Sequence, residues 1–74
     1  MASKGYEFPV VIEKDEDGVL IASVPALPGC HTQAKTLSVL MKRIKEAINL
    51  YLEVEGDVTP LKFVGLQEVE IARP

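Results

Sequence analysis

The sequence predicts a small α+β domain with the element order β-β-β-α-β, in which a small sheet of antiparallel type is covered on one face by a single amphipathic helix. Two observations lead to this class. Short segments of alternating polarity flank an acidic turn near the N-terminus. Further along, a stretch of about 19 residues repeats apolar side chains at helical spacing, and its length of roughly 28 Å suits it to cover such a sheet.

The first two predicted strands form a hairpin. Residues 6–14 alternate in polarity, and their apolar face comprises Tyr6, Phe8, Val10 and Ile12. Because Pro9 cannot donate a ladder hydrogen bond, this strand is expected at an edge of the sheet or paired from its other side there. Residues 15–18 read Asp-Glu-Asp-Gly, which predicts a turn with Gly18 at positive φ, and residues 19–24 form the returning strand.

The next segment is predicted to turn sharply before a third strand. Two prolines and a glycine lie within residues 25–29 and impose a stiff backbone path. Residues 30–34 are then short enough for a third strand. The loop therefore brings the chain back to the sheet before the helix begins.

The helix is expected from Leu37 to about Glu55, with Thr36 as its N-cap and Gly56 as its C-terminal stop. A loop over residues 57–60 and a last strand at about residues 66–72 complete the prediction. The whole chain, residues 1–74, is thus interpreted as one domain.

Two groups of apolar side chains have no predicted cover. Val11, Val19 and Ile21 fall on the sheet face away from the helix. Val39 and Leu50 project from the polar side of the helix, beside Arg43. A domain of this size buries only roughly 60% of its unfolded surface, and one Cys and one His provide neither a disulfide nor a zinc site to supplement it. The two groups are therefore expected to contact a partner or a second copy of the chain.

The proline-rich loop is a second candidate for a partner surface. Its residues are Pro25, Leu27, Pro28 and Gly29. The residues alone leave open which surface serves a partner and which serves self-association.

No catalytic, metal or cofactor site is predicted. Cys30 and His31 are the one candidate nucleophile–base pair, but adjacent strand residues point to opposite faces. The acidic turn at residues 15–17 offers too few oxygen ligands for calcium. Glutamates interrupt the modest basic patch on the helix, and the net charge is −3, so direct nucleic-acid binding is not expected. The lone thiol and the lack of a long apolar stretch indicate a cytoplasmic protein without a membrane span.

Three stretches carry a resemblance to a known family: residues 8–18, residues 22–33 and residues 44–53. The second contains Val-Pro-x-Leu-Pro-Gly-Cys and the third Glu-Ala-Ile-x-x-Tyr-Leu-Glu. Together they resemble the N-terminal domain of HicB-like antitoxins over about residues 6–55. The resemblance implies a partial ribonuclease-H-like fold without nuclease activity, assembly as a homodimer or homotetramer, and binding to HicA, a small basic toxin that cleaves mRNA.

The chain departs from the family pattern at three places. Ala26 stands where the family often has Asp, and residues 34–40 lack the acidic groups usual at the helix start. Many members also carry a C-terminal DNA-binding domain, which is not expected in a chain that ends at Pro74. The sequence therefore predicts an antitoxin module that masks a HicA-like toxin by protein–protein contact. The alternative is an orphan homo-oligomeric scaffold or ligand-binding domain.

Overall fold

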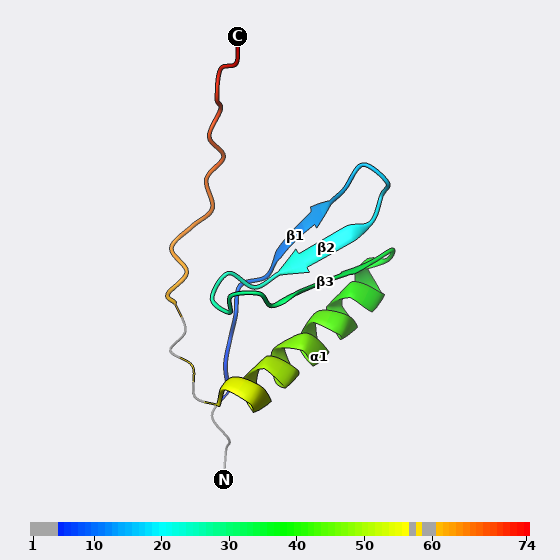
Figure 1. Cartoon of the computed structure of the whole chain (residues 1–74), viewed down its shortest axis with the longest axis vertical. Coiled ribbons are helices and arrows are strands. Elements are labelled where there is room, and N and C mark those ends of the chain that lie inside the picture. The colour runs from blue at the N-terminus through cyan, green and yellow to red at the C-terminus, as the bar shows by residue number, and fades with distance from the viewer. Residues whose placement is uncertain (1–4, 57, 59–60) are drawn as a thin grey trace.

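The computed structural model describes residues 5–56, 58 and 61–74. Within them, β1 (Val11–Lys14), β2 (Leu20–Ser23) and β3 (His31–Ala34) form an antiparallel sheet in the order β1-β2-β3. Helix α1 (Leu37–Glu55) follows and lies against one face of that sheet, over β2 and β3 (Figure 1). The predicted α+β class is confirmed. The loop expected at residues 57–60 falls, except for Val58, outside the described residues.

The β1–β2 hairpin is organised by the first residue of its turn. The backbone N–H of Gly18 donates to the carbonyl of Asp15 at 3.1 Å, and Gly18 has φ of 84°. One carboxylate oxygen of Asp15 also accepts from the N–H groups of Asp17 and Val19, each at 2.9 Å. Short acidic side chains favour such turns because they bond to nearby backbone N–H groups. The acidic cluster thus shapes the hairpin.

Two consecutive turns connect β2 to β3. The N–H of Leu27 donates to the carbonyl of Val24 at 3.0 Å, and the N–H of Cys30 donates to the carbonyl of Leu27 at 2.9 Å. A proline occupies the second position of each turn, where its fixed φ is favourable. Gly29 has φ of 83° at the third position of the second turn, as a type II turn requires. This path directs the side chain of Leu27 into the core, where it is 1% exposed.

Helix α1 begins and ends where the sequence predicts. The hydroxyl oxygen of Thr36 accepts a hydrogen bond from the N–H of Val39 at 3.3 Å, which satisfies a free donor at the helix start. At the other end the N–H of Gly56 donates to the carbonyl of Leu52 at 2.9 Å. Among the described residues, no helix is long and apolar enough to cross a lipid bilayer.

The core lies between α1 and the sheet. Leu40 and Ile44 are the helix residues at its centre, with 0% and 1% exposure. They pack against small side chains, Ala22 of β2 and Ala34 of β3, which allow the helix backbone to approach the sheet closely. Among the residues that the structure describes, the buried side chains are Ala22, Val24, Leu27, Cys30, Ala34, Leu40 and Ile44.

The C-terminal segment, residues 61–74, is extended but forms no strand (Figure 1). The strand expected at about residues 66–72 therefore lacks its ladder in this structure. The physical reason is that a strand exists only when a neighbouring backbone accepts and donates its hydrogen bonds. Here the segment projects away from the sheet, and all of its side chains are exposed.

Candidate partner-binding surface

One stripe of α1 lies along the outer edge of β3. It consists of Val39, Arg43, Leu50 and Val54, which at 100° per residue fall within about 60° of one another around the helix axis. The three apolar members, Val39, Leu50 and Val54, are 41%, 61% and 75% exposed. We refer to these four residues as the α1 stripe. It contains all three helix residues that the sequence singles out for contact.

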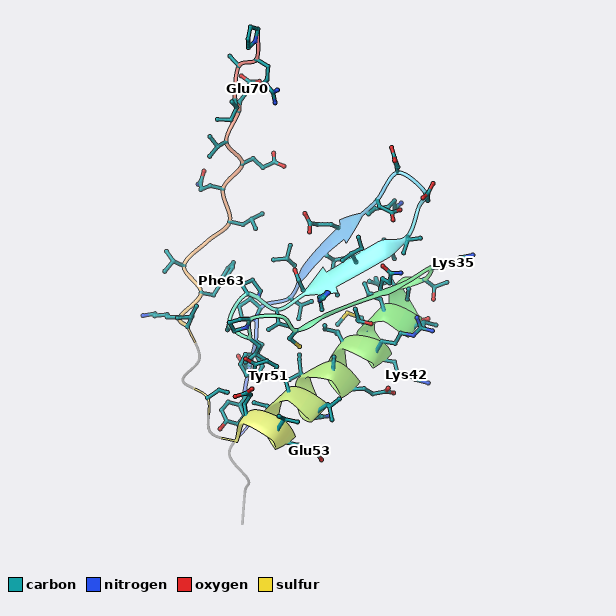
Figure 2. The ribbon with its side chains drawn as sticks, viewed as in Figure 1. Lys35, Lys42, Tyr51, Glu53, Phe63 and Glu70 are labelled. Atoms are coloured by element: carbon teal, nitrogen blue, oxygen red, sulfur yellow. The ribbon has the colours of Figure 1, made fainter. Side chains whose placement is uncertain are left out.

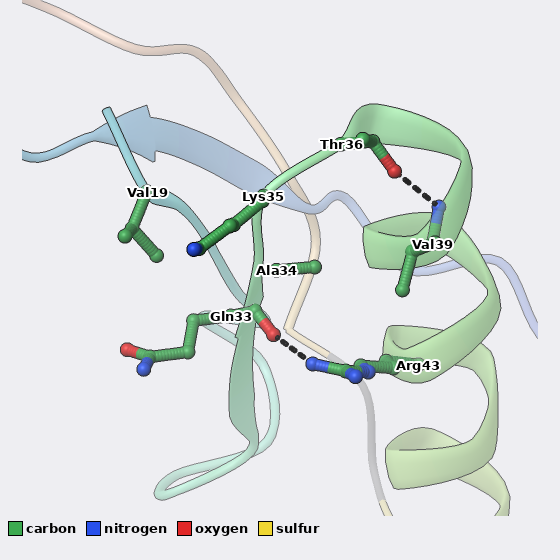
Figure 3. A pocket seen from close by; sticks show the side chains of 7 residues that line it. All are labelled: Val19, Gln33, Ala34, Lys35, Thr36, Val39 and Arg43. Carbon is green, nitrogen blue, oxygen red and sulfur yellow. Dashed lines mark hydrogen bonds between the residues drawn. The ribbon is translucent and has the colours of Figure 1, made fainter. Parts of the chain in front are cut away.

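A shallow groove occupies the end of the α1 stripe near the start of the helix (Figure 3). The guanidinium of Arg43 donates from Nη1 to the backbone carbonyl of Gln33 at 2.9 Å, across the groove from α1 to β3. The groove encloses about 420 Å³ and is lined by Val19, Gln33, Ala34, Lys35, Thr36, Val39 and Arg43. The fold therefore brings Val19, from the hairpin, together with Val39 and Arg43, from the helix.

A second hollow occupies the other end of the stripe. It lies between the last turns of α1 and the start of β3, and is lined by Gly29, Cys30, His31, Ala47, Leu50, Tyr51, Val54 and Glu55. Gly29 of the proline-rich loop and Leu50 of the helix thus border the same depression. Sequence reasoning treated these two residues as members of separate candidate surfaces.

Charge divides the α1 stripe into two halves. Lys35 and Lys42 lie near its start and Glu53 lies near its end (Figure 2). In the sequence, Arg43 belongs to the basic first half and Glu55 to the acidic end, with Lys45 and Glu46 between them. The first turn of α1 has no acidic residue and the last turn has no basic one. This arrangement is opposite to the one that the helix dipole favours. The end of the stripe around Leu50 and Val54 is consequently both apolar and acidic.

The remaining candidate residues lie elsewhere. Val11 and Ile21 are half-buried on the sheet face away from α1, as the alternation predicts. In the proline-rich loop, Pro25 and Pro28 are exposed. Leu27 belongs to the core instead, because the double turn points its side chain inward. Its side chain is thereby removed from the candidate surface.

Val11 also borders a hollow beside the C-terminal segment. The lining of this hollow comes from residues 61–66 on one side and from Pro9, Val11, Pro25 and Ala26 on the other. The first part of the C-terminal segment therefore runs past the beginning of β1. Nothing in the sequence pattern alone predicted this approach.

Cys30 and His31, the candidate nucleophile–base pair, lie in different environments. Cys30 is buried, and desolvation by burial raises the pKa of its thiol. His31 is exposed, and its ring Nδ1 lies 3.4 Å from the carbonyl oxygen of Gly29. In the part of the chain that the structure describes, no three His, Cys, Asp or Glu side chains are grouped so that they could hold a metal ion.

The similarity to known proteins agrees with this picture of a contact domain. Residues 8–70 match the family described as the HicB-like antitoxin of bacterial toxin–antitoxin systems. The chain belongs to this HicB-like antitoxin family. The match continues past α1 to Glu70, so the first ten residues of the C-terminal segment, 61–70, are part of the family's domain.

Several relatives align with nearly the whole HicB-like domain. A UPF0150 protein of Archaeoglobus fulgidus is 60% identical over 65 residues, which cover 88% of this chain and 94% of the relative. A UPF0150 protein of Synechocystis is 43% identical over 65 residues, with the same coverage of 88% and 94%. In contrast, an uncharacterized 14.9 kDa protein of Haemophilus phage HP1 is 46% identical over 46 residues, which cover 62% of this chain but 34% of the phage protein. The HicB-like sequence thus also forms one part of a longer protein.

Proposed function

We propose that this HicB-like domain is an antitoxin module that binds a HicA-type toxin, a small basic protein that cleaves mRNA, and masks it by protein–protein contact in the cytoplasm. The observation that carries the proposal is the family match over residues 8–70. The antitoxin acts by occupying the toxin's working surface and performs no catalysis itself. It also self-associates, as a homodimer or homotetramer.

The end of the α1 stripe around Leu50 and Val54 is the proposed toxin contact. These two side chains are 61% and 75% exposed, and their burial against a partner would remove apolar surface from water. Glu53 and Glu55 flank them, so the surface attracts a basic partner and repels an acidic one. The start of the stripe, with Lys35 and Arg43, has the wrong charge for a basic toxin.

Capture of the toxin tests the proposal. The full chain is co-expressed with a small basic HicA-like protein encoded beside it, and the expected results are relief of growth arrest and co-purification of the two proteins. The L50K variant is expected to weaken capture by about tenfold or more, because it replaces an apolar contact with a charge of the toxin's own sign.

V39K is the matched control, since Val39 lies on the same stripe at its basic end. It is expected to change toxin affinity by less than about threefold, with helix content unchanged in both variants. Equal losses in the two variants would move the contact away from Leu50. Failure to capture any HicA-like protein would favour the alternative, an orphan homo-oligomeric scaffold or ligand-binding domain.

A further inference from the structure

Strand β1 has an outer edge that no strand covers in the described chain. The helix does not cover this edge, because α1 contacts β2 and β3 but not β1. Ile12, on the helix side of β1, is 42% exposed, although its neighbour across the ladder, Ala22, is fully buried. An open edge with exposed apolar side chains is a site to which another strand can add.

The opposite edge of the sheet is protected. Helix α1 lies along β3, and the guanidinium of Arg43 donates a hydrogen bond to the carbonyl of Gln33 at 2.9 Å. A strand that added to β3 would have to displace this hydrogen bond and pass the helix. The sheet therefore has one edge that can be extended, at β1.

The C-terminal segment has the pattern of a strand without a partner. Over residues 68–71, Val69 and Ile71, which are 77% and 71% exposed, alternate with Glu68 and Glu70. Before them apolar side chains occupy both parities, with Leu61 and Phe63 on one and Val64 and Leu66 on the other. No backbone hydrogen bond joins residues 61–74 to the rest of the described chain. The second half of the segment is thus an amphipathic extended chain, and its backbone donors and acceptors have no partner in the described part of the chain.

We infer that the C-terminal segment adds to β1 of a second copy of this chain, as a fourth strand of that copy's sheet. Residues 61–66 pass Pro9 and Val11 of their own chain, and the following residues extend beyond their own sheet (Figures 1 and 2). The molecule is accordingly elongated, with extents of 57 × 27 × 20 Å. Each copy has one open edge and one free segment, so two copies satisfy both by a reciprocal exchange with twofold symmetry.

The length of the ladder follows from β1. The N–H of Asp15 donates to the carbonyl of Val19 across the hairpin. N–H direction alternates along a strand, so the backbone groups of β1 that face the open edge belong to Ile12 and Lys14. Pairing is therefore expected along Val11–Lys14. Four residues span roughly 13 Å at about 3.3 Å per residue, and residues 66–71 are long enough to pair with them. This inference deepens the self-association proposed above and does not depend on capture of the toxin.

Disulfide trapping between two differently sized chains tests the exchange. Both chains carry Cys30→Ala, one also carries Ile12→Cys, and the other, with an added tag, carries a single cysteine at one of positions 67 to 71 in turn. Covalent heterodimers are expected to form efficiently at alternate positions only, because neighbouring strand residues point to opposite faces. Equal trapping at all five positions, or none, would overturn the inference.

The same cysteines placed in one chain distinguish exchange from folding back. With Ile12→Cys and the best partner position combined, exchange gives covalent dimers, whereas pairing of the segment with its own β1 gives internally linked monomers. If internally linked monomers are the main product at dilute protein concentration, the proposed exchange is contradicted.

A proline in the segment provides a test without cross-links. V69P and E70P each remove one backbone donor. Because N–H groups of neighbouring strand residues point to opposite sides, at least one of the two variants is expected to convert a dimer into a monomer by light scattering on a sizing column. Glu70→Gln is the control and should leave the dimer intact. If both proline variants remain dimers, the interface lies elsewhere. Toxin capture measured on the same samples reports separately on the proposed function.

Discussion

Apolar side chains are buried in the folded body, residues 8–55, but exposed in the C-terminal segment, residues 61–74. In the body, Leu40 and Ile44 are almost completely buried between the helix and the sheet. In the segment, Val64 and Val69 are 93% and 77% exposed. Both regions have apolar residues at the spacing of regular structure. The comparison shows that a periodic apolar pattern is not enough to bury a segment. Burial also requires a complementary surface for the segment to pack against.

The largest expected effect comes from a core deletion in the body. Leu40→Ala removes a fully buried side chain and leaves a cavity under α1, so the free energy of unfolding should fall by about 2–5 kcal/mol. Val64→Ala in the segment should change it by less than about 0.5 kcal/mol. Urea denaturation of both variants at one protein concentration measures the contrast. Similar losses would mean that the segment is as well packed as the body.

The helix start provides the next test. Thr36→Ala removes the hydroxyl that accepts from the N–H of Val39, and should cost about 1 kcal/mol of stability. Ser38→Ala, two residues later and without a capping role in the structure, is the control. Thermal unfolding followed by circular dichroism reports both. An unchanged midpoint for Thr36→Ala would show that the cap contributes nothing to the body.

The two edges of the sheet can be compared through Arg43. Arg43→Met keeps most of the aliphatic length and removes the bond to the carbonyl of Gln33, with an expected loss of about 0.5–1 kcal/mol. Lys42→Met, also exposed on α1, should have almost no effect on stability. Amide hydrogen exchange along β3 should quicken in the first variant alone. Equal exchange in both would mean that Arg43 does not protect this edge.

The smallest expected effect concerns the thiol of Cys30. Burial raises its pKa above the ordinary value of 9.0, so the folded state retains the proton after the unfolded state has lost it. The thiol of Cys30 therefore makes its full contribution to the free energy of unfolding below pH 9, and this contribution is lost as the pH rises through the folded-state pKa. The stability of the natural chain should fall slightly more than that of Cys30→Ala above this pH. Parallel curves for the two chains would contradict it.

Much of the body could be predicted because its local signals agree with its tertiary contacts. The range Leu37–Glu55, the Thr36 cap and the Gly18 turn all follow from residues that favour those conformations. The sheet ladder starts only at Val11, although alternation begins at Tyr6. The reason is that the register of Val11 with Ser23 places Pro9 opposite Pro25, and neither proline has an N–H with which to continue the ladder.

The contact surface was predictable only in part. A helical projection is enough to group Val39, Arg43 and Leu50 on one stripe. It cannot show that Gln33 would accept from Arg43, since that bond depends on how α1 crosses β3. The burial of Leu27 was also missed, because two successive turns decide the direction of its side chain and the residue types at both are common in exposed loops.

The hydrogen bond from Arg43 to Gln33 bears on how many copies of the chain can join one sheet. A sheet with two free edges recruits copy after copy, which is the geometry of cross-β fibrils. Here the guanidinium blocks one side, so strands add at the other side only. Once two chains have exchanged their segments as proposed, neither has a free segment left to add to a third chain. The covered edge at β3 and the reciprocal exchange together would limit the assembly to two chains.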